Sequence, residues 1–135
     1  MQWDESMNLG FSEADESSLY LPVDPSEEAP TVASQEADPD SLLNTVRSII
    51  ALRHQEEDLQ ADAPLQIVCS DAGKPLVYCR GSLICVVNPG GGVLDIALPH
   101  DLADRIHGEV LFKTGDVSVK DGTIRAGSQS FAVVR

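Results

Sequence analysis

Acidic residues in close pairs are the first feature of this sequence that could carry out chemistry. Glu27 is followed directly by Glu28, and Asp38 lies two residues before Asp40. Paired carboxyl groups act as nucleophile and general acid or base when a rigid frame holds them roughly 5 to 5.5 Å apart. The surrounding stretch is rich in Pro, Ser and Glu and offers no such frame, so these carboxylates should stay solvated with ordinary pKa values. The sequence therefore predicts no catalytic residue here.

Other chemistry-bearing residue types lack the spacing that their chemistry needs. Zinc prefers Cys and His ligands, but Cys79, Cys85, His100 and His107 do not follow the spacing of a zinc site. The Gly-rich run at 88–92 lacks the Lys-Ser/Thr that completes a phosphate-binding loop. Ser, His and Asp occur without the Gly-x-Ser-x-Gly turn of a serine hydrolase. The sequence predicts no metal ligands and no cofactor.

Charge narrows the range of partners. The chain has 135 residues, about one domain, and a net charge of −13. Half of its 22 acidic residues and none of its 9 Lys and Arg residues lie before Ser41. Nucleic acid and anionic membrane surfaces both need basic residues to neutralise phosphate, so we expect neither as a partner.

Cysteine usage and hydropathy bear on the cellular setting. The three cysteines, Cys69, Cys79 and Cys85, cannot all pair within one chain, and each lies in an apolar run where a free thiol behaves as a small hydrophobe. There is neither a signal-peptide pattern nor an apolar run that approaches a membrane span. We therefore expect a reduced, cytoplasmic protein.

The elements that would position these residues fall into three segments, and the first, 1–37, is irregular and acidic. It shows no sustained hydrophobic period. Disorder alone does not explain its large side chains, so we interpret it as a long loop that lies on a scaffold. Those side chains are Trp3, Phe11, Tyr20, Leu21 and Val23.

Residues 38–58 form the second segment, a predicted amphipathic helix. Asp38 is a suitable cap, Pro39 suits the first helical position, and Asp40 favours the positive helix start. Apolar residues then recur every three or four positions and give one stripe. That stripe needs a partner surface. Its residues are Leu42, Leu43, Val46, Ile49 and Ile50.

The third segment, 64–135, reads as short strands joined by turns. Asp121-Gly122 between 117–120 and 123–125 is a strong hairpin signal. A helical turn is expected near Leu102 and Ala103. The strands are predicted at 65–69, 76–80, 83–88, 93–98, 109–113, 117–120, 123–125 and 131–134. The predicted fold class is mainly β: an antiparallel β-sandwich or Greek-key domain, preceded by one amphipathic helix and an irregular acidic segment.

Five short motifs appear in the order and spacing found in one known family. The chain resembles the C-terminal part of α-glucosidases of the oligo-1,6-glucosidase and maltase type, in the α-amylase superfamily (glycoside hydrolase family 13). Leu9 departs from the Ala that is usual there, and Tyr20 lies near the usual Trp. The motifs are Met1-Gln2-Trp3-Asp4, Gly10-Phe11-Ser12, Leu21-Pro22-Val23, Asp38-Pro39-Asp40-Ser41-Leu42-Leu43 and Ala51-Leu52-Arg53.

The resemblance implies that this chain holds the last barrel loop, the last barrel helix and the C-terminal β domain of such an enzyme. The three catalytic acids would then lie upstream of Met1, on a catalytic barrel that this chain lacks. It also implies that Gln2, Trp3 and Asp4 sit at the rim of the substrate site, where Trp3 could stack on a sugar or pack as a structural anchor. The substrate of the complete enzyme would be a small α-glucoside, whether maltose, isomaltose, sucrose or trehalose.

We therefore expect a non-catalytic C-terminal fragment whose β domain packs on and stabilises a barrel. On its own the chain should be inactive. It should self-associate through the helix stripe or dissolve poorly, unless the helix folds back on the β sheet. The alternative is a free-standing β-sandwich binding module with an acidic interaction tail. Binding modules usually expose two or three aromatic residues on one sheet face. Here Tyr78, Phe112 and Phe131 all lie in apolar runs that favour burial.

Overall fold

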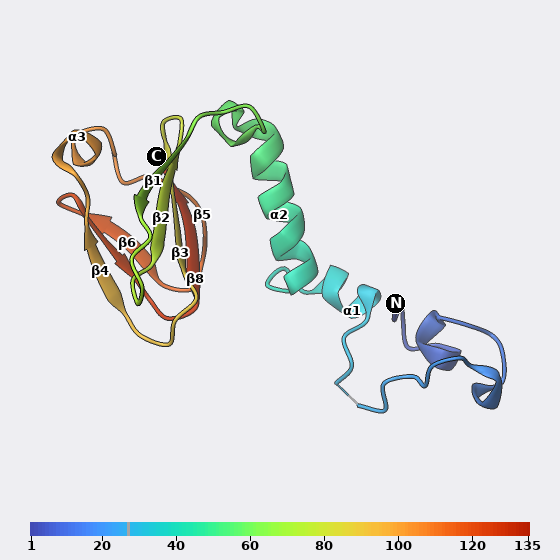
Figure 1. The fold of residues 1–135 in the computed structure, drawn as a ribbon. Coiled ribbons are helices and arrows are strands. Elements are labelled where there is room, and N and C mark those ends of the chain that lie inside the picture. The colour runs from blue at the N-terminus through green and yellow to red at the C-terminus, as the bar shows by residue number, and fades with distance from the viewer. Residues whose placement is uncertain (27) are drawn as a thin grey trace. The chain divides into compact units, whose positions relative to one another are not determined.

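The computed structural model describes residues 1–26 and 28–135, which form two compact units. Unit 1 is Met1–Ile50 and unit 2 is Ala51–Arg135. Figure 1 labels their helices and strands in chain order. The finer division into three segments at 1–37, 38–58 and 64–135 stays a prediction.

Unit 1 consists of short helical turns linked by extended chain. Two 3-10 turns, η1 (Met7–Gly10) and η2 (Glu16–Ser18), precede the helix α1 (Val32–Ala37). Thr31 caps α1: its hydroxyl accepts a hydrogen bond from the Ser34 N–H at 3.1 Å, and the Ser34 hydroxyl lies 3.1 Å from the Thr31 N–H in return. The segment predicted to be irregular thus also contains one short helix, which local capping stabilises.

The long helix α2 (Leu42–Gln55) begins later than the sequence predicts. Asp38 does not cap it. The Asp38 carboxylate instead accepts the Asp40 N–H at 2.9 Å, which closes a turn around Pro39. Ser41 is the cap, because its hydroxyl accepts the Asn44 N–H at 3.2 Å. The apolar stripe is largely exposed, with Leu42 at 73% and Ile50 at 51%.

Unit 2 contains the end of α2, the 3-10 turn η3 (Glu57–Leu59), eight strands and the short helix α3 (His100–Ala103). The strands alternate with tight turns, and Asp121-Gly122 forms the predicted hairpin between β6 and β7. The strands are β1 (Leu65–Cys69), β2 (Leu76–Arg80), β3 (Leu83–Asn88), β4 (Leu94–Ala97), β5 (Val110–Thr114), β6 (Val117–Lys120), β7 (Thr123–Ala126) and β8 (Ser130–Val134).

The strands form two antiparallel sheets that pack face to face (Figure 1). The larger sheet has the order β1-β2-β3-β8-β5 and the smaller one the order β4-β7-β6. Val77, Val86 and Val134 from the first sheet share one core cluster with Ile96 and Ile124 from the second. The predicted fold class, a mainly β antiparallel sandwich, is confirmed.

The larger sheet also has an apolar outer face, turned away from the smaller sheet. Leu83, Cys85 and Val133 are buried there. Phe112 and Phe131 are half-buried on the same face, with ring centroids 6.0 Å apart. When one face of a sheet is in water, apolar and polar residues normally alternate along each strand. Apolar residues on both faces of the larger sheet therefore favour a second surface that covers the outer face. Leu52 and Leu59, from the helical start of unit 2 (residues 51–60), pack against it.

Candidate functional site

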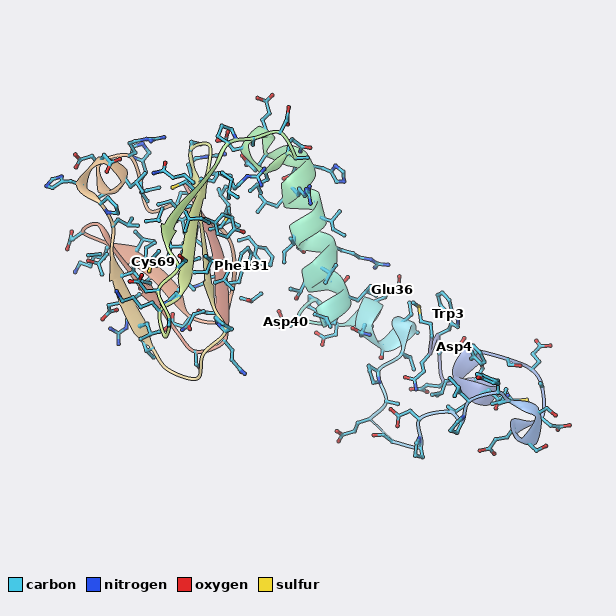
Figure 2. All side chains as sticks on the ribbon, in the orientation of Figure 1. Trp3, Asp4, Glu36, Asp40, Cys69 and Phe131 are labelled. Carbon is cyan, nitrogen blue, oxygen red and sulfur yellow. The ribbon has the colours of Figure 1, made fainter. Side chains whose placement is uncertain are left out.

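The three residues predicted to lie at a substrate rim occupy the start of unit 1, where the backbone of Gln2 and of Trp3 is bonded to α1. Figure 2 labels Trp3 and Asp4. The carbonyl of Gln2 accepts the Val32 N–H at 3.0 Å, and the carbonyl of Trp3 accepts the Ala33 N–H at 2.9 Å. These two N–H groups belong to the first turn of α1 and have no partner inside the helix. The first residues of the chain and the start of α1 therefore stabilise each other.

A left-handed turn holds Trp3 and Asp4 from the other side. Asn8, Leu9 and Gly10 all have positive φ, at 52°, 57° and 69°. The carbonyl of Leu9 accepts the N–H groups of Trp3 at 2.7 Å and Asp4 at 3.4 Å. A Cβ at Gly10 would lie 2.7 Å from Asp4 Oδ1, so only glycine fits. Leu9, by contrast, pays a conformational cost for its left-handed backbone.

The Asp4 side chain is engaged locally. Its Oδ1 accepts a hydrogen bond from the Ser6 hydroxyl and another from the Ser6 N–H at 2.8 Å. These bonds favour the charged form and lower the pKa of Asp4. A carboxylate in this state accepts hydrogen bonds well but is a poor proton donor, so Asp4 does not suit the role of a general acid.

A cleft of about 200 Å³ lies beside this turn. Gln2 lines it, whereas Trp3 and Asp4 are not among its lining residues. Asn8 also lines it, but its side-chain N–H groups already donate to the carbonyls of Ser12 and Ala14. The structure thus brings one of the three predicted rim residues to a cleft. The indole of Trp3 is 50% exposed.

The acidic pairs do not form a catalytic centre in the described residues. Glu27 lies outside them. Asp38 and Asp40 are both exposed, and the Asp38 carboxylate is occupied by the Asp40 backbone. Among residues 1–26 and 28–135, no group of three His, Cys, Asp or Glu side chains could hold a metal ion. The three cysteines are free thiols, two of them buried, and burial raises the pKa of Cys79 and Cys85.

The Gly-rich run at 88–92 is a structural loop. The Asn88 side chain is buried and donates to the carbonyls of Gly92 at 2.9 Å and Gly127 at 2.6 Å. Its own oxygen accepts the Gly90 N–H at 3.1 Å. Sequence reasoning missed this residue. A buried Asn at the end of an apolar strand, followed by Pro and Gly, was the available signal, since such a side chain needs several partners.

The second candidate site is the outer face of the larger sheet, together with the helical end that lies on it. Asp58 in η3 accepts two hydrogen bonds from Ser82 in the β2–β3 turn, from its N–H at 2.8 Å and its hydroxyl at 2.5 Å. These bonds lower the pKa of Asp58. The Arg135 guanidinium pairs with Glu56, beside η3.

Arg80 adds a third tie by donating to the carbonyl of Gln60, just after η3. Its Nε is buried and has no partner within the described part of the chain. Leu52 and Leu59 thus hold the segment 52–60 on the sheet by apolar contacts. Polar contacts add to them, from Arg80 to Gln60, from Ser82 to Asp58 and from Arg135 to Glu56. No helix in the described ranges is long and apolar enough to cross a membrane.

Curated relatives match part of the chain. The chain is 34% identical over 80 residues to a probable oligo-1,6-glucosidase 2 of Bacillus subtilis. It is 40% identical over 80 residues to a glucan 1,6-alpha-glucosidase of Streptococcus dysgalactiae subsp. equisimilis. Each match covers 59% of this chain and 14% of the relative, so the chain matches only a small share of those proteins. No protein-family model matches the chain.

Solved structures agree at the level of the fold. The trehalulose synthase MutB from Pseudomonas mesoacidophila aligns with 98% of this chain at a TM-score of 0.79 and 20% identity. A variant of the isomaltulose synthase from Erwinia rhapontici, in complex with D-glucose, aligns with 98% of it at a TM-score of 0.80 and 23% identity. In both cases the match covers 24% of the solved chain. The resemblance to α-glucosidases of glycoside hydrolase family 13 is confirmed, and the matches fit a C-terminal part of such an enzyme.

Proposed function

We propose that this chain works as the non-catalytic C-terminal part of an α-glucosidase, in which unit 2 packs on a catalytic barrel and stabilises it. The complete enzyme would hydrolyse α-glucosidic bonds of small oligosaccharides in the cytoplasm. Its substrate and its catalytic acids would belong to the barrel. The relatives support this class, since the two named above are both described as glucosidases.

The apolar outer face of the larger sheet is the observation that carries the proposal. Its buried part is continuous with side chains that remain open to water: Leu65 at 60%, Ile67 at 52% and Leu76 at 37%. Burying apolar surface stabilises by about 25 cal/mol per Å². A partner that covers this face would therefore gain stability and confer it. The free cysteines and their odd number support a reducing compartment.

The rim residues extend the proposal. Gln2 would present its amide to the cleft next to the barrel mouth, and Trp3 would offer an exposed aromatic face to a sugar ring. Asp4 would act through its hydrogen bonds to Ser6, by fixing the turn that carries Trp3. The backbone of all three is also positioned by contacts with Leu9 and α1.

A chimera tests the docking role. This chain replaces the corresponding C-terminal segment of the Bacillus subtilis oligo-1,6-glucosidase 2, and the chimera is compared with its Leu76→Asp variant. Leu76 is partly exposed in this chain, so the substitution should cost the isolated chain less than about 1 kcal/mol. Against a barrel surface it buries an unpaired charge and should cost at least about 2 kcal/mol. The measurement is the thermal inactivation of α-1,6-glucosidase activity, together with thermal unfolding of the isolated chain.

Gln66→Asp is the matched control, because Gln66 is exposed on the neighbouring edge strand β1 and, opposite Cys79, lies on the other side of the sheet from Leu76. It should leave the inactivation temperature of the chimera unchanged. Equal effects of Leu76→Asp in the chimera and in the isolated chain would refute docking through this face. Hydrolysis of a chromogenic α-glucoside by the isolated chain would refute its non-catalytic role.

The free-standing binding module finds less support. Tyr78, Phe112 and Phe131 are half-buried in the outer-face cluster and do not form a platform of open aromatic rings.

A further inference from the structure

The edge strand β1 differs from the other three sheet edges of unit 2. The edge strands of the larger sheet are β1 and β5, and those of the smaller sheet are β4 and β6. Each edge strand except β1 contains a charged side chain: Lys113 in β5, Asp95 in β4 and Lys120 in β6. Charged residues on an edge discourage pairing with another chain. β1, with the sequence Leu-Gln-Ile-Val-Cys, contains no charge and no proline.

The register of β1 shows which backbone groups face outward. The Gly81 N–H donates to the Pro64 carbonyl at 3.2 Å, so residues 64 and 81 form a hydrogen-bonded pair. Hydrogen-bonded and non-hydrogen-bonded pairs alternate in an antiparallel ladder. Gln66 is therefore bonded to Cys79, whereas the N–H and C=O groups of Leu65 and Ile67 point away from β2. The same two residues also carry the most exposed apolar side chains of the strand.

We propose that β1 is a dimerisation edge, on which β1 of a second copy of this chain adds in the antiparallel direction. A two-fold axis at Gln66 places Leu65 opposite Ile67 of the second copy, and each copy offers two donors and two acceptors. This register uses only the regular part of β1, because the ladder shifts between Ile67 and Cys69. An uncharged, self-complementary strand of this kind fits a second copy better than a charged partner.

The whole-chain charge opposes this pairing. Two copies that each carry −13 repel one another, and salt screens that repulsion. The contact is also shorter than a standard protein interface, so the dimer should be weak and concentration-dependent. It does not rest on the docking role, since it uses the backbone edge of β1 rather than the outer face.

The test is sedimentation equilibrium of the full 135-residue chain at low and high salt, with amide exchange followed by NMR. Dimerisation should strengthen as salt rises. Exchange of the Leu65 and Ile67 amides should slow with increasing protein concentration, while the Gln66 amide, already bonded within the sheet, should not change. Ile67→Lys should weaken the dimer at least about tenfold, because it brings like charges together at the edge.

Leu76→Lys is the matched control. It places the same charge on the outer face, but on β2, which is hydrogen-bonded on both sides. It should leave the concentration-dependent protection at 65 and 67 in place, as should Val46→Lys on the α2 stripe. Circular dichroism checks that each variant folds. The proposal is overturned by a monomer at all concentrations, by equal losses in Ile67→Lys and Leu76→Lys, or by association that leaves the Leu65 and Ile67 amides unprotected.

Discussion

At several positions in this chain, backbone geometry decides which residue type fits. Gly81 shows this clearly. Its φ is +54°, and a Cβ there would lie 2.0 Å from Asp58 Oδ1, the carboxylate that also binds Ser82. The turn between β2 and β3 can approach η3 only because this position has no side chain. Gly73, in the β1–β2 turn, has a φ of +77° but open space around it.

The two glycines separate a conformational cost from a steric one. Gly73→Ala should lower the free energy of unfolding by about 1 kcal/mol, the cost of a left-handed backbone for a residue with a Cβ. Gly81→Ala adds the clash and the loss of the Asp58–Ser82 bonds, so it should cost about 2–4 kcal/mol. Urea denaturation of both variants gives the comparison. Equal losses would show that Asp58 can move away from position 81 at no cost and that the Asp58–Ser82 hydrogen bonds contribute little to stability.

How far the sequence predicts this structure also depends on the kind of residue involved. The apolar alternation of β2 and β3 and the Asp121-Gly122 turn are local signals, and the strands and hairpin occur where they predict. The cap of α2 is Ser41 rather than Asp38, because Asp38 uses its carboxylate to close its own turn. Two good capping residues three positions apart compete, and sequence alone does not rank them.

Contacts between distant residues were beyond sequence reasoning. Asp58 and Ser82 are separated by more than twenty residues, and nothing in either local pattern marks them as partners. The same holds for Glu56 and Arg135. The rim residues illustrate the point in unit 1, where the chain start could be singled out by motif but its pairing with the first turn of α1 could not.

At the scale of the elements, the outer face of the larger sheet pairs a phenol with a thiol across two strands. Tyr78 on β2 lies opposite Cys85 on β3. Burial, followed by the neighbouring Cys85, raises the pKa of Tyr78 to about 12, and burial raises the pKa of Cys85 as well. Both groups are neutral when protonated, so the folded state favours their protonated forms.

Stability should therefore depend on alkaline pH in a defined direction. The contribution of Tyr78 is fully present below the unfolded pKa of about 10 and is lost as pH rises toward 12. The free energy of unfolding, measured by urea titration between pH 8 and about 11.5, should fall more steeply in the parent chain than in Tyr78→Phe. The difference should stay within about 1–2 kcal/mol, because the ring is only half-buried.

Tyr20→Phe, at a residue that is 97% exposed, is the control and should leave the profile unchanged. Parallel profiles for the parent chain and Tyr78→Phe would contradict the assignment.

At the scale of the whole molecule, buried apolar surface is distributed unequally between the two units. Every member of both core clusters lies at Leu52 or later in the chain. In the described part of unit 1 the buried residues are the polar Thr31 and Ser41, while Trp3, Phe11 and Tyr20 are exposed. Hydrogen bonds and caps define the conformation of unit 1, but it lacks the apolar burial that usually provides stability. This agrees with a segment that completes its fold on a larger scaffold.

Limited proteolysis should reveal that difference. Treatment of the full chain with a protease of broad specificity should first cut within residues 1–40 and leave a resistant fragment that contains the β-sandwich, because local opening costs little where few apolar contacts exist. Mass spectrometry identifies the cut sites. Bonds within residues 1–40 should be cut at least about tenfold faster than bonds within unit 2. In the chimera with the oligo-1,6-glucosidase the same bonds should become resistant, since this segment would then lie on the barrel. Cleavage of residues 1–40 at the same rate in both settings would mean that this segment has no scaffold to lie on, and the interpretation of its exposed aromatic residues as docking anchors would fail.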